Sequence, residues 1–508
     1  MDCDLLLKNG HFITLEPSQP FVSSIAIKNG RIAWLGNEWK GLVKKEIDLN
    51  GAYGYPGLVD AHMHILYAGL VQSYLHLHGI SDQETVLRMV QERVQQLKPG
   101  DWLIGVGWDD HHWPKNDRLN ALELDKVAPD NPVVLQRYDT HLMWVNTITL
   151  KLDGIEANTL DPSGGVIGRD ATGQPNGILI DFAMMPVRKI WPWPDFEGKK
   201  ELILSFLNDC LKKGLTSVHN AATDQNDFPV FEALALQNEL PLRIYGMIAM
   251  RDDKPTALFE EGPRSISEFL QMRCLKFWMD GAMGSRGAAL FEPYVDDAGN
   301  RGLLFWDQAE WLSILEKAKA KGFQVATHAI GDRASHLVLD AYEKIGFGNL
   351  RWRIEHAQQL IPKDIPRLGR LGVIASMQPL HEEIDLVFLE KRLGAKRVEE
   401  GSFPWSKLLA SGTHLAGGSD APVVDFNPLL GISAVSKTLT RIEALQMYTL
   451  GGAYAAFQET ELGTLKVGKW ADIAIFPEDI LTCSPETLLK MDALYTIVGG
   501  KIAYAQNT

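Results

Sequence analysis

The chain has 508 residues and a mass of 56.6 kDa, which suits one large domain with a smaller satellite. Its 45% hydrophobic and 22% charged residues are typical of an ordinary soluble globular protein. The formal net charge of −14 argues against a nucleic-acid partner and against adhesion to anionic membranes, because both need a basic face.

The N-terminal segment, MDCDLLLK, carries acids where a signal peptide carries positive charge, and its apolar run is short. No stretch of the sequence approaches the roughly 18 apolar residues of a membrane span. The four cysteines are scattered without a CxxC pair, so neither a disulfide framework nor a zinc ribbon is indicated. The sequence therefore predicts a cytoplasmic protein.

At both ends of the chain, the sequence pattern is typical of short strands separated by turns. Asn9-Gly10 and Asn29-Gly30 each separate two apolar runs, which is the strongest short signal for a β-hairpin. Neither end holds enough strands to bury a sheet face alone. We therefore expect residues 1–56 and 461–508 to form one small composite β-sandwich, with a large domain at 57–460 inserted between them.

Within this large domain, short apolar runs alternate with helical patterns such as 308–321. Eight alternating units favour a TIM (β/α)8 barrel over a doubly wound open sheet, since no GxGxxG follows any of the runs. About 150 residues separate the first two runs, far more than an ordinary connection. Most of 70–195 is therefore expected to be an inserted lobe, with a helix at 82–97. The expected strands are 58–64, 215–220, 242–249, 274–279, 323–328, 353–356, 373–378 and 414–420.

Chemistry-bearing residues gather at the ends of these predicted strands, where barrels of this kind carry their active sites. Each alone has an ordinary explanation, such as a structural histidine or a helix cap, but a lysine inside an apolar strand is costly unless neutralised. Six such residues at strand ends together predict one central site. They are His62, His64, Lys276, His328, His356 and Asp420.

The motifs VDAHMH, KFWMDG, THAIGD, RIEHAQ and GSDAP closely resemble those of the metal-dependent amidohydrolase superfamily. More narrowly, the chain is similar to the branch that includes N-substituted formamide deformylases. The insert motifs GVGWDD and PVVLQRYDTHLMWVN, and the C-terminal GTLKVGKWADIAIF, are also similar to that family. The resemblance covers essentially the whole chain.

The resemblance implies a binuclear centre of two divalent metal ions, most simply zinc. His62, His64 and Asp420 would hold the more buried ion, and His328 and His356 the more exposed one. Lys276, carboxylated by CO2, would bridge the two. A hydroxide shared by the ions would attack the carbonyl of a small-molecule amide substrate, an N-acyl or N-formyl amine, and Asp420 would carry the proton to the leaving amine.

Several further residues are predicted to contact the substrate. The resemblance singles out Trp108 and Asp109 in the insert and His141 in the Asp139-Thr140-His141 turn. The others lie after predicted strands, on the rim that carries the metal ligands. They are Asp280, Arg286, His219 and Gln378.

Two other functions stay open at this point. In the deaminases of the same superfamily, the resemblance implies a glutamate three residues after the fifth-strand histidine, whereas His328 is followed by Ala329, Ile330 and Gly331. A metal-bound barrel without activity, serving in regulation, is the third reading. The sequence fits a homodimer no better than a monomer.

Overall fold

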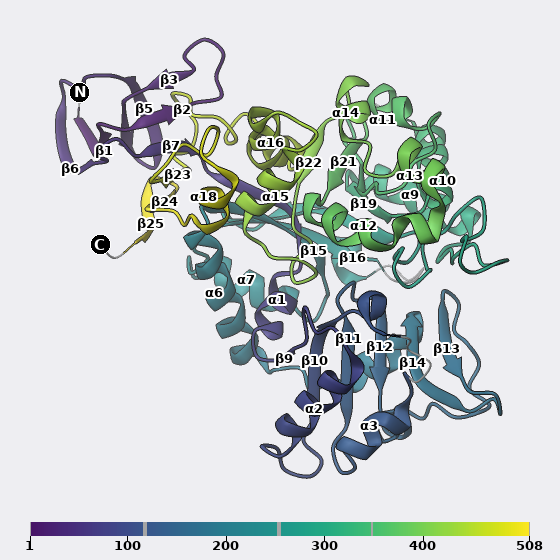
Figure 1. Ribbon diagram of the computed structural model, residues 1–508. Helices are drawn as coiled ribbons and strands as arrows, with labels where there is room; N and C mark the ends of the chain where they lie inside the picture. The colour runs from purple at the N-terminus through teal and green to yellow at the C-terminus, as the bar shows by residue number, and fades with distance from the viewer. Residues whose placement is uncertain (1, 115–118, 251–255, 347–348, 507–508) are drawn as a thin grey trace.

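The computed structural model describes residues 2–114, 119–250, 256–346 and 349–506. Figure 1 shows a β-sandwich that holds both chain ends, a central barrel, and a lobe of strands and helices beside the barrel. Within the described residues, no helix has the length and apolar character that crossing a membrane requires.

Eight parallel strands form the barrel wall, and their spatial order follows their order along the chain. A bridge between Met63 and Ala421 joins the first strand to the segment after the last, so the wall is nearly closed. The predicted (β/α)8 barrel is thus confirmed. The strands are β8 (Leu58–Met63), β15 (Leu215–Thr223), β16 (Arg243–Ala249), β18 (Leu270–Trp278), β19 (Gln324–Ala329), β20 (Arg353–His356), β21 (Ile374–Met377) and β22 (Leu415–Gly417).

Helices cover the outside of the barrel. Helix α9 (Gln308–Lys321) coincides with the predicted helix, begins at the Asp307 cap and ends at Gly322, whose φ of 81° suits a glycine. The other principal barrel helices are α1 (Ile65–Val71), α6 (Phe196–Lys212), α7 (Phe228–Leu236), α10 (Asp332–Ile345), α11 (Ile365–Leu371), α12 (Pro379–Leu393) and α15 (Pro428–Val435).

The β-sandwich is built from both ends of the chain, as predicted. One sheet has the order β5-β4-β1-β6, and the other, β25-β24-β23-β7-β2-β3, mixes C-terminal and N-terminal strands. Apolar side chains from both sheets, such as Ile25 and Ile473, are fully buried between them. The strands are β1 (Asp2–Lys8), β2 (His11–Ile13), β3 (Phe21–Val22), β4 (Ser24–Lys28), β5 (Arg31–Gly36), β6 (Leu42–Asp48), β7 (Tyr53–Pro56), β23 (Ile473–Phe476), β24 (Tyr495–Val498) and β25 (Lys501–Ala505).

The two Asn-Gly turns have different roles. Asn29-Gly30 joins β4 to β5 in an antiparallel hairpin, as expected. The hairpin expected at Asn9-Gly10 is wrong, because β1 pairs with β4 and β6 while β2 pairs with β3 and β7 in the other sheet. Asn9, at φ 55°, turns the chain from one layer of the sandwich to the other.

The inserted lobe follows β8 and α1, as the long interval predicts. Its sheet has the order β13-β14-β12-β11-β10-β9. Helices α2 and α3 lie against this sheet, and α2 begins directly after its Asp82 cap. The lobe elements are β9 (Leu75–His76), α2 (Gln83–Val94), β10 (Leu103–Trp108), α3 (Ala121–Val127), β11 (Val133–Arg137), β12 (Leu142–Val145), α4 (Thr147–Leu152), β13 (Gly165–Arg169), β14 (Pro175–Asp181) and α5 (Met185–Ile190).

Candidate metal centre

The structure brings all six predicted ligand residues to one cavity of about 180 Å³ at the C-terminal mouth of the barrel. These side chains come from β8, β18, β19, β20 and the segments that follow β8 and β22. His64 lies one residue beyond β8, where it precedes α1, and Asp420 lies beyond β22. Buried parallel strands end at one rim of a barrel, so residues far apart in the chain converge there.

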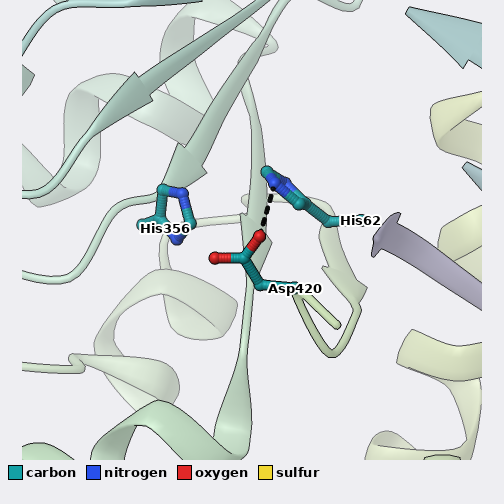
Figure 2. Close-up of side chains that lie close together, drawn as sticks. All are labelled: His62, His356 and Asp420. Atoms are coloured by element: carbon teal, nitrogen blue, oxygen red, sulfur yellow. Dashed lines mark ion pairs between the residues drawn. The ribbon is translucent and has the colours of Figure 1, made fainter. Parts of the chain in front are cut away.

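Donor atoms in this cavity lie within reach of one another. Asp420 Oδ1 is 3.2 Å from His62 Nε2 and 3.0 Å from His64 Nε2, and Figure 2 shows the carboxylate between the rings of His62 and His356. His62, His356 and Asp420 each offer one ligand atom within 4.8 Å of the others. The ring centroids of His328 and His356 lie 4.4 Å apart.

His62 is oriented by a buried ion pair behind it. Its Nδ1–H donates to Glu355 Oε2 at 2.5 Å, and Glu355 Oε1 lies 2.7 Å from Arg353 Nε. All three side chains are buried. This contact leaves Nε2 of His62 facing the cavity, the arrangement by which a carboxylate fixes the tautomer of a metal-ligating histidine.

Asp60 ties the first strand to the loop that carries Asp420. Its carboxylate accepts hydrogen bonds from the backbone N–H groups of His62, at 2.9 Å, and Ser419, at 3.0 Å. Asp420 and His356 both have a left-handed backbone, with φ of 58° and 74°. Such residues cost of order 1–3 kcal/mol each and persist only where the surroundings fix them, often at functional sites.

Burial affects the protonation of Lys276 and of two of the histidines, His328 and His356. It lowers the pKa of Lys276 to about 8, so a neutral amine is accessible near physiological pH. It also lowers the pKa of His328 and His356 well below the usual range, which favours the neutral imidazole that binds metal. His356 Nδ1 is buried and, in the described part of the chain, has no hydrogen-bond partner.

His141 is the predicted substrate-contact residue that the structure places directly at this cavity. Its ring lies 5.3 Å from that of His328, and its Nδ1 is 2.5 Å from Asp181 Oδ1. Asp139 Oδ1 accepts a hydrogen bond from the backbone N–H of His141 at 3.1 Å, which holds the turn. His141 is thus positioned by two carboxylates.

Three other predicted contacts lie near the centre but do not line the cavity. Asp280 accepts hydrogen bonds from three backbone N–H groups, including those of Ile330 at 3.0 Å and Gly331 at 2.8 Å, so it organises the loops. His219 is buried within the barrel, with Nδ1 3.0 Å from Arg353 Nη1. Gln378 is 1% exposed and donates to its neighbour Ser376.

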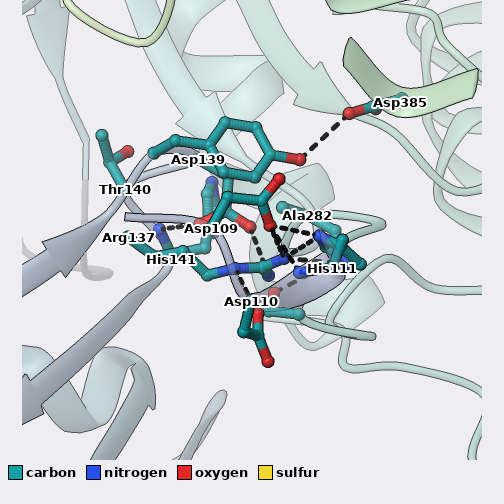
Figure 3. A network of polar contacts seen from close by, with 12 residues as sticks. Asp109, Asp110, His111, Arg137, Asp139, Thr140, His141, Ala282 and Asp385 are labelled. Carbon is teal, nitrogen blue, oxygen red and sulfur yellow. Dashed lines mark hydrogen bonds and ion pairs between the residues drawn. The ribbon is translucent and has the colours of Figure 1, made fainter. Parts of the chain in front are cut away.

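The remaining three predicted contacts lie away from the cavity. Trp108 is fully buried in the lobe core, where its Nε1–H donates to the Leu135 carbonyl, and it does not line the cavity. Arg286 pairs with Asp296 at 3.0 Å on a surface loop. Asp109 belongs to a network that surrounds the Arg137 guanidinium (Figure 3).

The Arg137 network connects the lobe to the site. Arg137 pairs with Asp139 at 3.1 Å, and the same Asp139 holds the turn at His141. Burial would raise the pKa of Asp109, but the hydrogen bond from His111 and the charges of His111 and Arg137 lower it to about 2. Asp109 therefore acts at a distance from the cavity, by fixing the guanidinium that fixes Asp139.

Sequence reasoning missed Glu355, Arg353 and Asp181, which orient His62 and His141. Glu355 and Arg353 did leave a signal, because two charged residues in a short barrel strand that also carries His356 must be paired when the strand is buried. Asp181 left none, since its contact with His141 joins residues 40 positions apart in the chain.

Comparison with known proteins identifies the family of this chain. The Amidohydrolase family matches residues 45–504. Protein LONG AFTER FAR-RED 3 of Arabidopsis thaliana is 34% identical, over 99% of this chain and 91% of its own length. N-substituted formamide deformylase of Arthrobacter pascens is 26% identical, over 99% of this chain and 98% of its own.

A solved structure shows the same architecture. An uncharacterized metal-dependent hydrolase from Pyrococcus furiosus has a TM-score of 0.74 at 27% identity, and the match covers 94% of this chain and 100% of that one. The resemblance inferred from the motifs is confirmed by these matches. The chain therefore belongs to the amidohydrolase family and is a metal-dependent hydrolase acting on carbon–nitrogen bonds.

Proposed function

We propose that this protein hydrolyses an amide-type C–N bond in a small N-acyl or N-formyl amine, using two zinc ions bridged by carboxylated Lys276. One observation carries the proposal: all six predicted ligands (four imidazoles, a buried amine and a carboxylate), which come from barrel strands and the segments directly after them, line a single cavity. The identity of the metal, the number of ions and the carbamate all belong to this proposal.

The donor set fits metal ions. Imidazole and carboxylate are common zinc ligands, and the cavity offers them with a carboxylate behind His62 to fix its tautomer. The buried, unpartnered Nδ1 of His356 is a polar atom that a ligand would satisfy. His62, His64 and Asp420 would hold one ion, and His328 and His356 the other.

Lys276 suits a carbamate better than an ammonium. Its Nζ lies 3.3 Å from His62 Nε2, and no carboxylate within the described residues forms an ion pair with it. An ammonium so placed would repel a cation at His62, whereas a neutral amine can add CO2 and present anionic oxygens to both ions. The lowered pKa of Lys276 makes that neutral amine accessible.

When bound, the ions polarise the substrate carbonyl and lower the pKa of water toward neutrality. The side chains transfer the proton and orient the substrate. Asp420 accepts the proton from the attacking water and returns it to the leaving amine. His141, held at Nδ1 by Asp181, presents Nε2 toward the cavity and orients the substrate carbonyl. The buried walls exclude bulk water.

A deaminase is the alternative within the family, and the geometry supports it less. Asp332 is the carboxylate nearest in sequence after His328, but it is 4% exposed and accepts a hydrogen bond from the backbone N–H of Phe291. It therefore serves the loop at the start of α10. Release of ammonia from an aminated heterocycle would favour the deaminase.

The metal content tests the proposal directly. We would express the protein with bicarbonate and zinc, measure zinc per chain, and assay a panel of small amides. About two zinc ions per chain with amide turnover supports the proposal. A metal-loaded protein that hydrolyses no amide would instead support a silent regulatory barrel.

Two variants test the roles of individual residues. Lys276→Ala should lose bound zinc and activity together, whereas Lys469→Ala, a matched buried lysine outside the site, should keep both. Asp420→Asn should remain folded but lose turnover by about 10²–10⁴-fold, the range of a general acid–base group. If Lys276→Ala retained all of its zinc, the proposal that a carbamate on Lys276 bridges the ions would be refuted.

A further inference from the structure

Two cavities of unequal size meet at the candidate metal centre. They share His141, His328, His356 and Asp420 as wall residues. The larger has a volume of about 180 Å³ and the smaller about 30 Å³. An amide has one group on each side of its scissile bond, so a substrate centred on the shared residues would place one group in each cavity.

Packed side chains line the smaller cavity. Met283 and Val423 are 1% and 6% exposed, and Ile384 completes the apolar wall. On its polar side, Gln358 donates to Asp385, the carboxylate seen in Figure 3. A volume of 30 Å³ is room for about two water molecules. An aromatic ring does not fit without displacing this wall.

The polar atoms indicate which side of the amide enters this cavity. Asp420 directs Oδ1 to His62 and His64, while Oδ2 lies 3.9 Å from His381 Nε2. In the part of the chain that the structure describes, this His381 nitrogen is buried without a hydrogen-bond partner. A carboxylate oxygen and an imidazole nitrogen side by side suit the N–H groups of an amide.

The larger cavity suits an apolar acyl chain. Its walls include Leu66, Phe182, Phe231 and Phe305, together with the Trp278 ring. Such walls bind by removing apolar surface from water, and Arg188, Asp224 and Asp227 also line this cavity. The acyl group is therefore the part with room to vary.

We propose that the smaller cavity receives the nitrogen of the scissile amide, so that the leaving group is ammonia or methylamine and the acyl part is the larger group. This inference rests on the proposed amide hydrolysis. The water oxygen bonds to the carbonyl carbon, the C–N bond breaks, and the amine leaves with a proton from the water. The products are a carboxylic acid and a small amine.

A matched substrate series tests the inference on the zinc-loaded full chain. We would compare phenylacetamide, N-methylphenylacetamide and N-benzylphenylacetamide, with N-benzylformamide as the reverse arrangement. The first two should be hydrolysed, and kcat/KM should fall by about 100-fold or more for both N-benzyl compounds, since even one methylene in a tight pocket is worth about 10–200-fold.

Variants of the cavity wall separate size from other causes. Met283→Ala and Val423→Ala should each raise kcat/KM for N-benzylphenylacetamide relative to phenylacetamide by about 10-fold. Phe305→Ala, in the larger cavity, should instead change the preference among acyl groups. Zinc content and thermal unfolding would show that each variant is folded and loaded.

The outcomes distinguish this inference from the function on which it rests. If N-benzylformamide is the best substrate and the primary amide is inert, the assignment of the cavities is overturned while amide hydrolysis stands. If the zinc-loaded protein hydrolyses none of the four compounds or other small amides, both fall. If the wall variants leave the N-benzyl preference unchanged, the smaller cavity does not limit the leaving group.

Discussion

Glu355→Gln isolates the buried contact that orients His62. The change keeps the side-chain shape but removes the charge that pairs with Arg353 at 2.7 Å and accepts from His62 at 2.5 Å. Both partners are 0% exposed, so Arg353 is left without its counter-charge. Breaking a buried ion pair costs about 3–5 kcal/mol, and losing the carboxylate behind a ligating histidine lowers metal affinity by about 10–100-fold.

Two measurements separate these effects. Urea unfolding of the metal-free protein gives the loss in free energy of unfolding, and zinc titration against a competing chelator gives the affinity. Asp472→Asn is the matched control, because Asp472 pairs with Arg243 at 2.8 Å, is 5% exposed and lies outside the metal cavity. It should lose stability comparably and keep its zinc affinity.

The zinc affinity decides whether Glu355 orients His62 for metal binding. If Glu355→Gln binds zinc as tightly as the unmodified chain, Glu355 does not orient His62 for binding the metal. Equal loss of affinity in Asp472→Asn would instead assign the effect to general destabilisation. Either result would refute the reasoning about the ion pair behind the site.

Three further changes test the lobe and the residues around His141. Trp108→Ala should cost about 3–5 kcal/mol in urea unfolding and leave relative substrate preference unchanged, because Trp108 lies in the lobe core. Asp181→Asn should lower kcat/KM with zinc content unchanged, since it frees His141; loss of zinc would contradict this. Asp109→Asn should lower the free energy of unfolding by about 2 kcal/mol at pH 7. Because the pKa of Asp109 is about 2 in the folded chain against 3.8 ordinarily, that difference should vanish as pH falls from about 4 to about 2 in acid titrations.

Local pattern was enough for the barrel and its rim. Each barrel strand is a short apolar run between turn or helix signals, and each candidate ligand lies within such a run or shortly after it. Once eight such units are recognised, right-handed connections between parallel strands place all the C-terminal strand ends at the same rim of the barrel. His328 and His356 could therefore be assigned to one site without any knowledge of their distance.

Contacts between segments far apart in the chain could not be predicted from local sequence pattern. Asn9-Gly10 has the composition of a hairpin turn, yet the pairing of β1 with β4 sends the chain to the other sheet. Trp108 lies at the end of a strand, as His356 does, but this strand belongs to the lobe sheet and Trp108 packs into the lobe core.

The sequence by itself determined the barrel, the sandwich from both chain ends and the set of candidate ligands, because these depend on periodicity and on the order of elements. Only the tertiary structure decided that Glu355 supports His62, that Asp181 supports His141 and that the site divides into a large and a small cavity. Those features depend on distances of a few ångströms between residues far apart in the chain, which burial and packing fix and local sequence does not encode.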